Sequence, residues 1–212
     1  MPELPYVGDP AEADFQALYG PWSPWTPREV AQALAGWDRP WWLVGGWAID
    51  AFTGTDRRHE DIDVGMLRAH VPDLLSYLGK PWHCWAAGSG ALRPLTSDDD
   101  ELPEWADQCW VRRHAWSPWV ADFITAADVD GAWVFRRDPS VVLPLEQTTW
   151  ERDGMAYQNP EIVLAFKAKL ARDKDDADLE RTWPLLDEHQ RAWLRSTVER
   201  LHPGHHWLET MC

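Results

Sequence analysis

The residues of this chain that are best suited to chemistry lie in two short stretches, a pair of glycines and a pair of aspartates. Gly45 and Gly46 follow a short apolar run, and Asp61 and Asp63 come later, separated by Ile62. Side chains of an extended strand alternate between its two faces. We therefore expect the two aspartates to point the same way, with the isoleucine turned into the core.

Two neighbouring carboxylates repel each other, and burial increases the repulsion. A cation between them relieves it, and hard oxygen ligands favour Mg²⁺ or Mn²⁺. A glycine pair lets backbone amides approach a phosphate closely at the start of a helix. A metal site beside a phosphate-binding turn predicts phosphoryl or nucleotidyl transfer. The alternative is that the aspartates are solvated at a strand end and the glycines only form a turn.

The order and spacing of these residues resemble a known superfamily. Residues 45–50 read Gly-Gly-Trp-Ala-Ile-Asp, and residues 57–63 read Arg-Arg-His-Glu-Asp-Ile-Asp. This pattern is similar to the nucleotidyltransferase (DNA polymerase β-like) superfamily, and within it to the aminoglycoside 2″-nucleotidyltransferases and lincosamide nucleotidyltransferases. Residues 160–178 resemble the helical end of the same enzymes. The resemblance implies an α+β fold, with a nucleotidyltransferase-type mixed β-sheet flanked by helices and a C-terminal helical subdomain.

The resemblance also implies roles for the glycines and aspartates. Asp61 and Asp63 would bind the metal, and the amides of Gly45 and Gly46 would bind the β- and γ-phosphates of a nucleoside triphosphate. The superfamily often has a serine after the first glycine. Here a second glycine and Trp47 follow instead, which matches the antibiotic-modifying branch and leaves only backbone donors.

Members of the superfamily usually carry a third carboxylate on a neighbouring strand, as metal ligand or general base. Asp122 is the candidate, because it is a lone acid inside the apolar segment 119–124 and a buried acid needs a partner or a metal. A strand-edge aspartate facing water is the alternative. Glu104 and Asp107 are the reserve candidates.

Basic residues near the acidic pair are candidates for binding the triphosphate. Either Arg57 or Arg58 could reach it, and Arg58 is our candidate for the nucleotide site. A structural ion pair with Asp50 or Glu60 is the alternative. For His59 we expect a packing or supporting role.

The C-terminal segment offers further basic residues. Lys167 and Lys174 stand out in an acidic chain. We expect Lys167 to contact phosphate, with pairing to nearby acids as the alternative. Asp175 and Asp178 are expected to be intramolecular partners of the lysines.

The amino-acid composition narrows the class of substrate that the chain is expected to bind. The formal net charge is −15, from 35 acidic and 20 basic residues. Nucleic-acid binding draws on a basic surface, so we expect no nucleic-acid partner and favour a small acceptor. An acidic surface attracts polycations such as aminoglycosides, or only keeps the protein soluble.

Other sequence features bear on location. No apolar run approaches the roughly 18–20 residues of a membrane helix, so we expect no membrane partner. The N-terminus lacks signal-peptide features. Cys84, Cys109 and Cys212 are scattered, which favours free thiols in the cytoplasm.

Local patterns predict three regions: an irregular N-terminal segment (1–27), a catalytic domain (28–150) and a helical subdomain (151–212). A capping box at Thr26–Glu29 with proline at the first helical position predicts a helix start. The predicted strands are 41–44, 61–64, 82–86, 108–113, 119–124 and 132–136. The other predicted helices are 46–52, 71–78, one starting at 160, 175–186 and one from 187 to before 203.

Together these features predict a Mg²⁺-dependent nucleotidyltransferase. It would move NMP from an NTP, with ATP as the first candidate, to a hydroxyl of a small molecule such as an aminoglycoside or lincosamide antibiotic. A relative that adenylylates or binds a protein partner, including an antitoxin-type protein, is the alternative. A catalytically silent scaffold is a third hypothesis.

Overall fold

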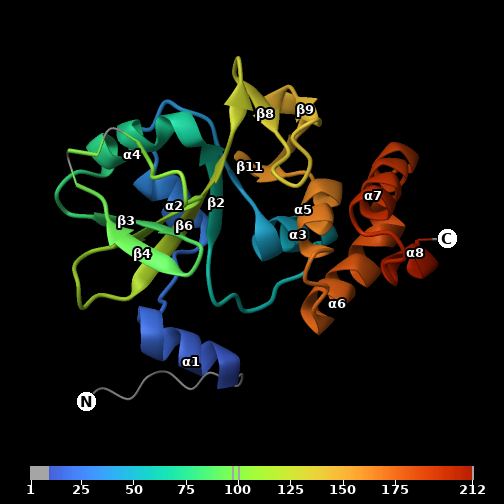
Figure 1. The fold of residues 1–212 in the computed structure, drawn as a ribbon, viewed down its shortest axis with the longest axis horizontal. Coiled ribbons are helices and arrows are strands. Elements are labelled where there is room, and N and C mark those ends of the chain that lie inside the picture. Colours follow the sequence, from blue (N-terminus) through green and yellow to red (C-terminus); the bar gives the residue numbers. More distant parts are fainter. Residues whose placement is uncertain (1–9, 97, 100, 212) are drawn as a thin grey trace.

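The computed structural model describes residues 10–96, 98–99 and 101–211, and it has a mixed sheet with helices packed around it (Figure 1). The eight-stranded sheet has the order β10-β11-β1-β2-β6-β5-β3-β4, and a second sheet has the order β7-β8-β9. The strands are β1 (Trp41–Leu43), β2 (Asp63–Leu67), β3 (His83–Gly88), β4 (Ala91–Pro94), β5 (Gln108–Arg112), β6 (Trp119–Ala126), β7 (Asp128–Val129), β8 (Ala132–Val134), β9 (Val142–Leu143), β10 (Thr149–Arg152) and β11 (Met155–Gln158). The predicted α+β class is confirmed.

Helices α5 to α8 gather at one end of the molecule, next to α3, while α2 and α4 lie at the other end (Figure 1). The helices are α1 (Pro10–Tyr19), α2 (Pro27–Ala33), α3 (Gly45–Thr53), α4 (Val71–Leu78), α5 (Pro160–Lys167), α6 (Asp173–Thr182), α7 (Glu188–Leu201) and α8 (Trp207–Thr210). Short 3₁₀ turns occur at Arg68–His70, Leu145–Gln147 and Trp183–Leu185. No helix of the described residues is long and apolar enough to cross a membrane.

Strand β2 is the element that positions the acidic residues. It runs antiparallel to β1 and parallel to β6, with Asp63 opposite Asp122. A parallel pair needs a long crossover connection. Here the crossover contains α4 and strands β3, β4 and β5, which extend the sheet beyond β6. Two aspartates far apart in the sequence therefore meet on neighbouring strands.

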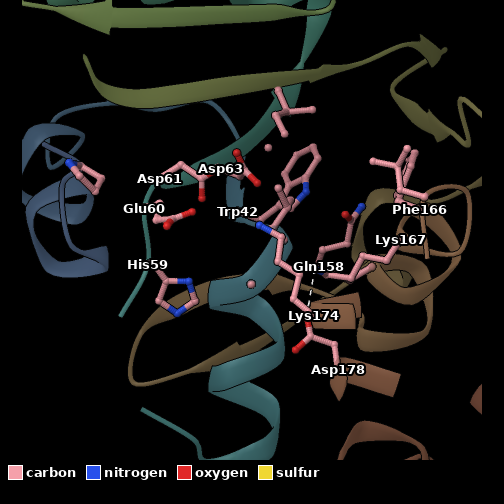
Figure 2. A pocket seen from close by; sticks show the side chains of 18 of the residues that line it. Trp42, His59, Glu60, Asp61, Asp63, Gln158, Phe166, Lys167, Lys174 and Asp178 are labelled. Carbon is pink, nitrogen blue, oxygen red and sulfur yellow. Dashed lines mark ion pairs between the residues drawn. The ribbon is translucent and has the colours of Figure 1, made fainter. Parts of the chain in front are cut away.

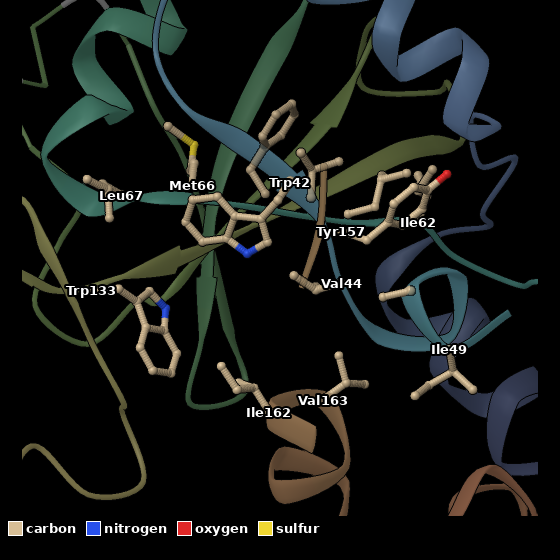
Figure 3. Packing of buried hydrophobic residues seen from close by; sticks show 14 of the residues in the cluster. Trp42, Val44, Ile49, Ile62, Met66, Leu67, Trp133, Tyr157, Ile162 and Val163 are labelled. Carbon is tan, nitrogen blue, oxygen red and sulfur yellow. The ribbon is translucent and has the colours of Figure 1, made fainter. Parts of the chain in front are cut away.

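The main core fills the space between the sheet and helices α3 and α5 (Figure 3). Ile49 comes from α3 and Ile162 from α5, and both are almost fully buried with Trp42 of β1. Ile62 has no exposed surface, so the prediction that it turns into the core is confirmed. Burying apolar surface at about 25 cal/mol per Å² makes this packing the main force that holds α3 and α5 on the sheet.

Several local predictions are confirmed. The Thr26 hydroxyl accepts from the amide of Glu29 at 3.3 Å, and the Glu29 carboxylate accepts from the amide of Thr26 at 2.7 Å. Helix α4 spans residues 71–78 as predicted, and a second capping box at Asp187 begins α7. Strand β2 begins only at Asp63, so Asp61 lies just before the strand and not within it.

Two predictions about the ends of the chain need correction. Within the segment predicted to be irregular (1–27), residues 10–19 form α1. The predicted helical subdomain (151–212) begins with strand residues of β10 and β11, and its first helix begins at Pro160, as predicted. Asp153 and Gly154 join the two strands with φ of 53° and 74°, as in a tight hairpin turn. The division into three regions otherwise stays a prediction.

The free-thiol prediction is confirmed for two cysteines. Cys84 and Cys109 are unpaired and buried. Cys212 lies outside the described residues.

Candidate active site

A cavity of about 680 Å³ lies where the start of α3, the start of β2, the end of β6 and helices α5 and α6 meet (Figure 2). Its charge is opposite to that of the whole chain, because seven of the 20 basic residues line it but only four of the 35 acidic ones. The basic residues are Arg57, Arg58, Arg136, Arg137, Lys167, Arg172 and Lys174, and the acidic ones are Glu60, Asp61, Asp63 and Asp178. Such a lining favours an anionic ligand.

The glycine pair forms the first turn of α3 at the cavity wall. Gly45 has a φ of +62°, and a Cβ atom there would lie 2.6 Å from Oδ2 of Asp63. A Cβ on Gly46 would lie 2.9 Å from Cε1 of His59. Val44 precedes the helix and offers no side-chain cap. The first amides of α3 therefore lack a side-chain acceptor, as expected where a helix N-terminus binds an anion.

The structure brings the predicted acidic residues together. Asp122 is 5% exposed, and its Oδ1 atom is buried without a hydrogen-bond partner. Burial raises the pKa of Asp122 well above its usual value, and the charges of Asp63 and Asp61 raise it further. Burial, followed by the charge of Asp61, also raises the pKa of Asp63 to about 8, against the opposing effect of Lys167. Each acid thus stands where its ionised form is costly unless a cation is nearby.

These acids fit a hard divalent cation by their chemistry. Among the described residues, no three acidic, imidazole or thiol groups stand close enough together to hold a metal ion in this conformation. The unpartnered oxygen of Asp122 and the half-buried carboxyl of Asp63 are nevertheless the kind of oxygen ligand that Mg²⁺ and Mn²⁺ prefer. Asp61 is exposed at the cavity rim, and its carbonyl accepts from Trp47 Nε1 at 3.1 Å. The assignment of Asp61, Asp63 and Asp122 as the ligands of such an ion stays a prediction.

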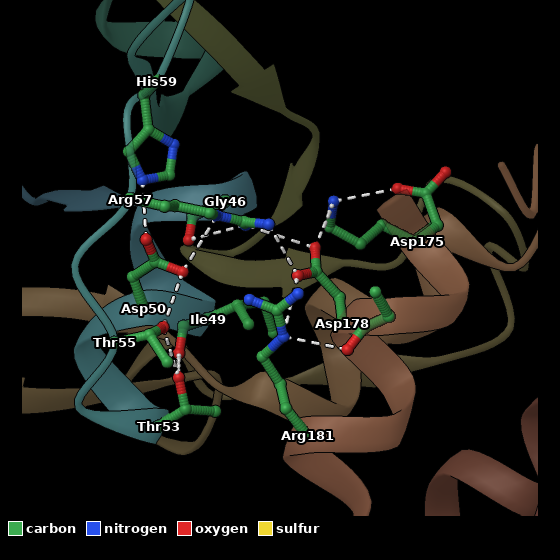
Figure 4. A network of polar contacts seen from close by, with 12 residues as sticks. Gly46, Ile49, Asp50, Thr53, Thr55, Arg57, His59, Asp175, Asp178 and Arg181 are labelled. Atoms are coloured by element: carbon green, nitrogen blue, oxygen red, sulfur yellow. Dashed lines mark hydrogen bonds and ion pairs between the residues drawn. The ribbon is translucent and has the colours of Figure 1, made fainter. Parts of the chain in front are cut away.

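A polar network supports the glycine turn from behind (Figure 4). Arg57 places Nε 3.0 Å from Asp50 and Nη1 2.9 Å from Asp178. His59 lies 2.8 Å from Asp50, and its ring stacks on Trp47 at 4.1 Å between centroids. The alternative predicted for Arg57, a structural ion pair with Asp50, is confirmed. The packing role predicted for His59 is also confirmed.

Lys167 is held at the cavity wall by two buried acids. Its Nζ lies 3.0 Å from Asp175 and 3.0 Å from Asp178, and neither acid has exposed surface. The prediction that these aspartates partner the lysine is confirmed. Lys167 still lines the cavity, so its predicted contact with phosphate stays a prediction. The same holds for Arg58, which is exposed at the cavity wall.

Of the other basic cavity residues, only Lys174 was weighed in the sequence analysis, whereas Arg136, Arg137 and Arg172 were not. Arg172 and Lys174, at the start of α6, both lower the pKa of Asp63 through their charge. Arg136 and Arg137 follow β8 and also line the cavity. In the sequence, Arg172 and Lys174 stand among four aspartates in residues 172–178, so no local excess of positive charge marks them. The position of Arg136 and Arg137 depends on the tertiary fold.

The reserve candidates for the third carboxylate lie elsewhere. Asp107 forms an ion pair with Arg136, and Glu104 is exposed. Neither lines the cavity. Asp122 is opposite Asp63 on the neighbouring strand and does not line the cavity either, and it is the most buried of the three predicted metal ligands.

The comparisons agree with a nucleotidyltransferase fold. Residues 28–81 match the family described as aminoglycoside-2″-adenylyltransferase. The lincosamide antibiotic adenylyltransferase LnuA with bound lincomycin has a similar structure, with a TM-score of 0.53 and 17% identity over 77% of this chain and 100% of that one. The solution structure of the antibiotic-resistance factor ANT(2″)-Ia gives a TM-score of 0.51 and 17% identity over 85% and 95% of the two chains. No curated protein sequence matches. The predicted nucleotidyltransferase fold and the resemblance to the antibiotic-modifying branch are confirmed.

Proposed function

We propose that this chain is a Mg²⁺-dependent nucleotidyltransferase that moves NMP from an NTP, with ATP as the first candidate, to a hydroxyl of a small molecule. The observation that carries the proposal is the pairing of Asp63 with Asp122 on neighbouring parallel strands, beside the start of α3. LnuA is named for lincosamides and the matching family for aminoglycosides. Both names support a small hydroxylated acceptor.

The nucleotide would bind with its β- and γ-phosphates at the first turn of α3. The amides of Gly45 and Gly46 lie there without a side-chain cap, and a helix N-terminus favours anions. Lys174, Arg172 and Arg58 line the same cavity. Their positive charge would stabilise the pyrophosphate as it leaves.

The acidic residues would bind the metal ion and accept the proton of the acceptor hydroxyl. A divalent ion bound by Asp61, Asp63 and Asp122 would neutralise phosphate charge. The acceptor hydroxyl oxygen forms a bond to the α-phosphorus, the bond to the β-phosphate oxygen breaks, and pyrophosphate leaves. The hydroxyl proton also needs a base, and Asp122 is our candidate for it as the alternative to its role as a metal ligand.

The test is transfer of label from α-labelled ATP to an acceptor by the Asp63→Asn and Asp122→Asn variants. We expect each to lower kcat/KM by at least about 10²–10⁴-fold, the usual effect of losing a positioned acid–base group. Asn keeps the size of the side chain, so circular dichroism and the melting temperature should show an intact fold. Glu199→Gln, at an exposed acid on α7, is the matched control. Unchanged turnover by Asp63→Asn would refute the site assignment.

A further inference from the structure

The carboxylates of the cavity bear on the charge of the acceptor. Four acids line it: Glu60, Asp61, Asp63 and Asp178. A polycationic acceptor needs carboxylates that face it and are not already paired, because an ammonium group loses its hydration on entering the cavity. The number of these four carboxylates that have no cationic partner therefore limits the positive charge that the acceptor can carry.

Asp178 is already neutralised. It has no exposed surface, and it lies 2.9 Å from Arg57, 3.0 Å from Lys167 and 3.8 Å from Arg181. Three cations surround this single carboxylate, and Figure 4 shows two of them, Arg57 in the segment after α3 and Arg181 on α6. It offers no negative charge to a ligand.

Asp61 and Asp63 belong to the metal under the proposed function, on which this inference rests. Glu60 is then the remaining acid. It is exposed, and it forms no ion pair with any described residue. Figure 2 shows it beside Asp61 on the segment that leads into β2.

The basic lining residues are more numerous than that single acid. Arg57, Lys167, Arg172 and Arg136 have acidic partners. Arg58, Arg137 and Lys174 form no ion pair with any residue that the structure describes. A triphosphate can be matched by these three cations and the metal, which leaves no carboxylate besides Glu60 free for the acceptor.

The rest of the lining is largely apolar and aromatic. It comes from the N-terminal segment, β6, β8 and α5, and includes Trp22, Ile124, Trp133, Val134, Val163 and Phe166. An apolar wall favours a ligand with an apolar face. Polar rings bearing several ammonium groups gain little from such a wall.

We infer that the acceptor is a hydroxylated amphiphile that carries at most one positive charge, and that Glu60 is the residue that binds this charge. The acidic character of the chain resides outside the cavity and does not describe the acceptor. A polycation such as an aminoglycoside would meet only one free carboxylate.

The test compares three probes of increasing charge on the full chain: octyl glucoside below its micelle concentration (neutral), lincomycin (one amine) and tobramycin (polycationic). Each is titrated calorimetrically into protein saturated with Mg²⁺ and a non-hydrolysable ATP analogue, and then assayed for transfer with ATP. We expect the tightest binding from octyl glucoside or lincomycin. Tobramycin should bind at least about 100-fold more weakly, because its extra ammonium groups have no free carboxylate in the cavity.

Glu60→Gln supplies the second readout. It should weaken binding of lincomycin relative to octyl glucoside by about 10-fold, the effect of losing one charge pair of about 1.4 kcal/mol. Glu188→Gln, at an exposed acid at the start of α7, should leave that ratio unchanged.

The outcomes separate this inference from the proposed function. If tobramycin binds best, or if neither low-charge probe binds at millimolar concentration, the inference is wrong while nucleotidyl transfer stands. If the ATP analogue itself fails to bind with Mg²⁺, the proposed function is wrong and the inference falls with it. A lincomycin-to-glucoside ratio that Glu60→Gln does not change would overturn the role of Glu60.

Discussion

Replacing Asp178 with asparagine should destabilise the protein strongly although the two side chains have nearly the same shape. Asp178 is fully buried on α6, and it joins Arg57, next to the glycine turn, to Lys167 on α5. Removing its charge leaves two cations, 28% and 13% exposed, with less compensation. Breaking a buried ion pair from one side costs about 3–5 kcal/mol.

The expected value lies at the lower end of this range. Arg57 keeps Asp50 as a partner at 3.0 Å, and Lys167 keeps Asp175 at 3.0 Å. We therefore expect a loss of about 3 kcal/mol in the free energy of unfolding. For a chain of this size that corresponds to a fall in Tm of roughly 6–12 °C.

Thermal unfolding followed by calorimetry measures this fall. Glu180→Gln is the matched control, because Glu180 is an exposed acid on the same helix and forms no ion pair with a described residue. It should change the Tm by less than about 2 °C. A Tm for Asp178→Asn within the range of the control would refute the view that this network holds α3, α5 and α6 together.

Three further predictions follow from the same structure. Gly45→Ala should weaken ATP binding at least about 10-fold in a calorimetric titration, because its Cβ would lie 2.6 Å from Asp63 and its φ of +62° is unfavourable for alanine; wild-type affinity would contradict the tight approach. In the absence of metal, the raised pKa of Asp63 means that the folded state holds a proton that the unfolded state has lost, so the free energy of unfolding should fall as pH rises from about 4 to about 8. Either Mg²⁺ or Asp63→Asn should make this fall with pH less steep, and an equal dependence on pH in all three samples would contradict the prediction. Thr26→Ala should lower the free energy of unfolding by about 1 kcal/mol through loss of the α2 cap, as denaturant titration would show, whereas an unchanged midpoint would mean that α2 is held by packing alone.

The parts of the fold that were predictable carry their signals locally. The helix starts at Thr26 and Asp187 depend on side chains three residues apart, which bond to each other's backbone. The hairpin of β10 and β11 also carries a local signal, since Asp153-Gly154 is typical of a tight turn between strands. The prediction from the sequence did not use this signal. The hairpin residues form strands because β11 pairs with the edge of β1 and β10 pairs with β11.

The candidate site was predictable where its chemistry is concentrated in one stretch. Gly45, Gly46, Asp61 and Asp63 lie within twenty residues and have a recognisable order. Asp122 was found as a lone acid in an apolar segment, and the parallel pairing of β2 with β6 then places it beside Asp63.

The partners of the basic residues needed the fold. Arg57 meets Asp178 across 121 positions of sequence, and no local pattern encodes that contact. The same holds for the neutralisation of Asp178, on which the inferred charge of the acceptor depends.

The central claim is that the aspartate pair and the glycine turn form a metal-dependent nucleotide site. Calorimetric titration of ATP, GTP, CTP and UTP into the protein, first with Mg²⁺ and then with EDTA, tests it most directly. We predict binding of at least one nucleotide with Mg²⁺, loss of that binding with EDTA, and loss of it with Mg²⁺ in Asp63→Asn. Nucleotide binding that is equally strong in EDTA, or no binding of any nucleotide with Mg²⁺, would contradict the account.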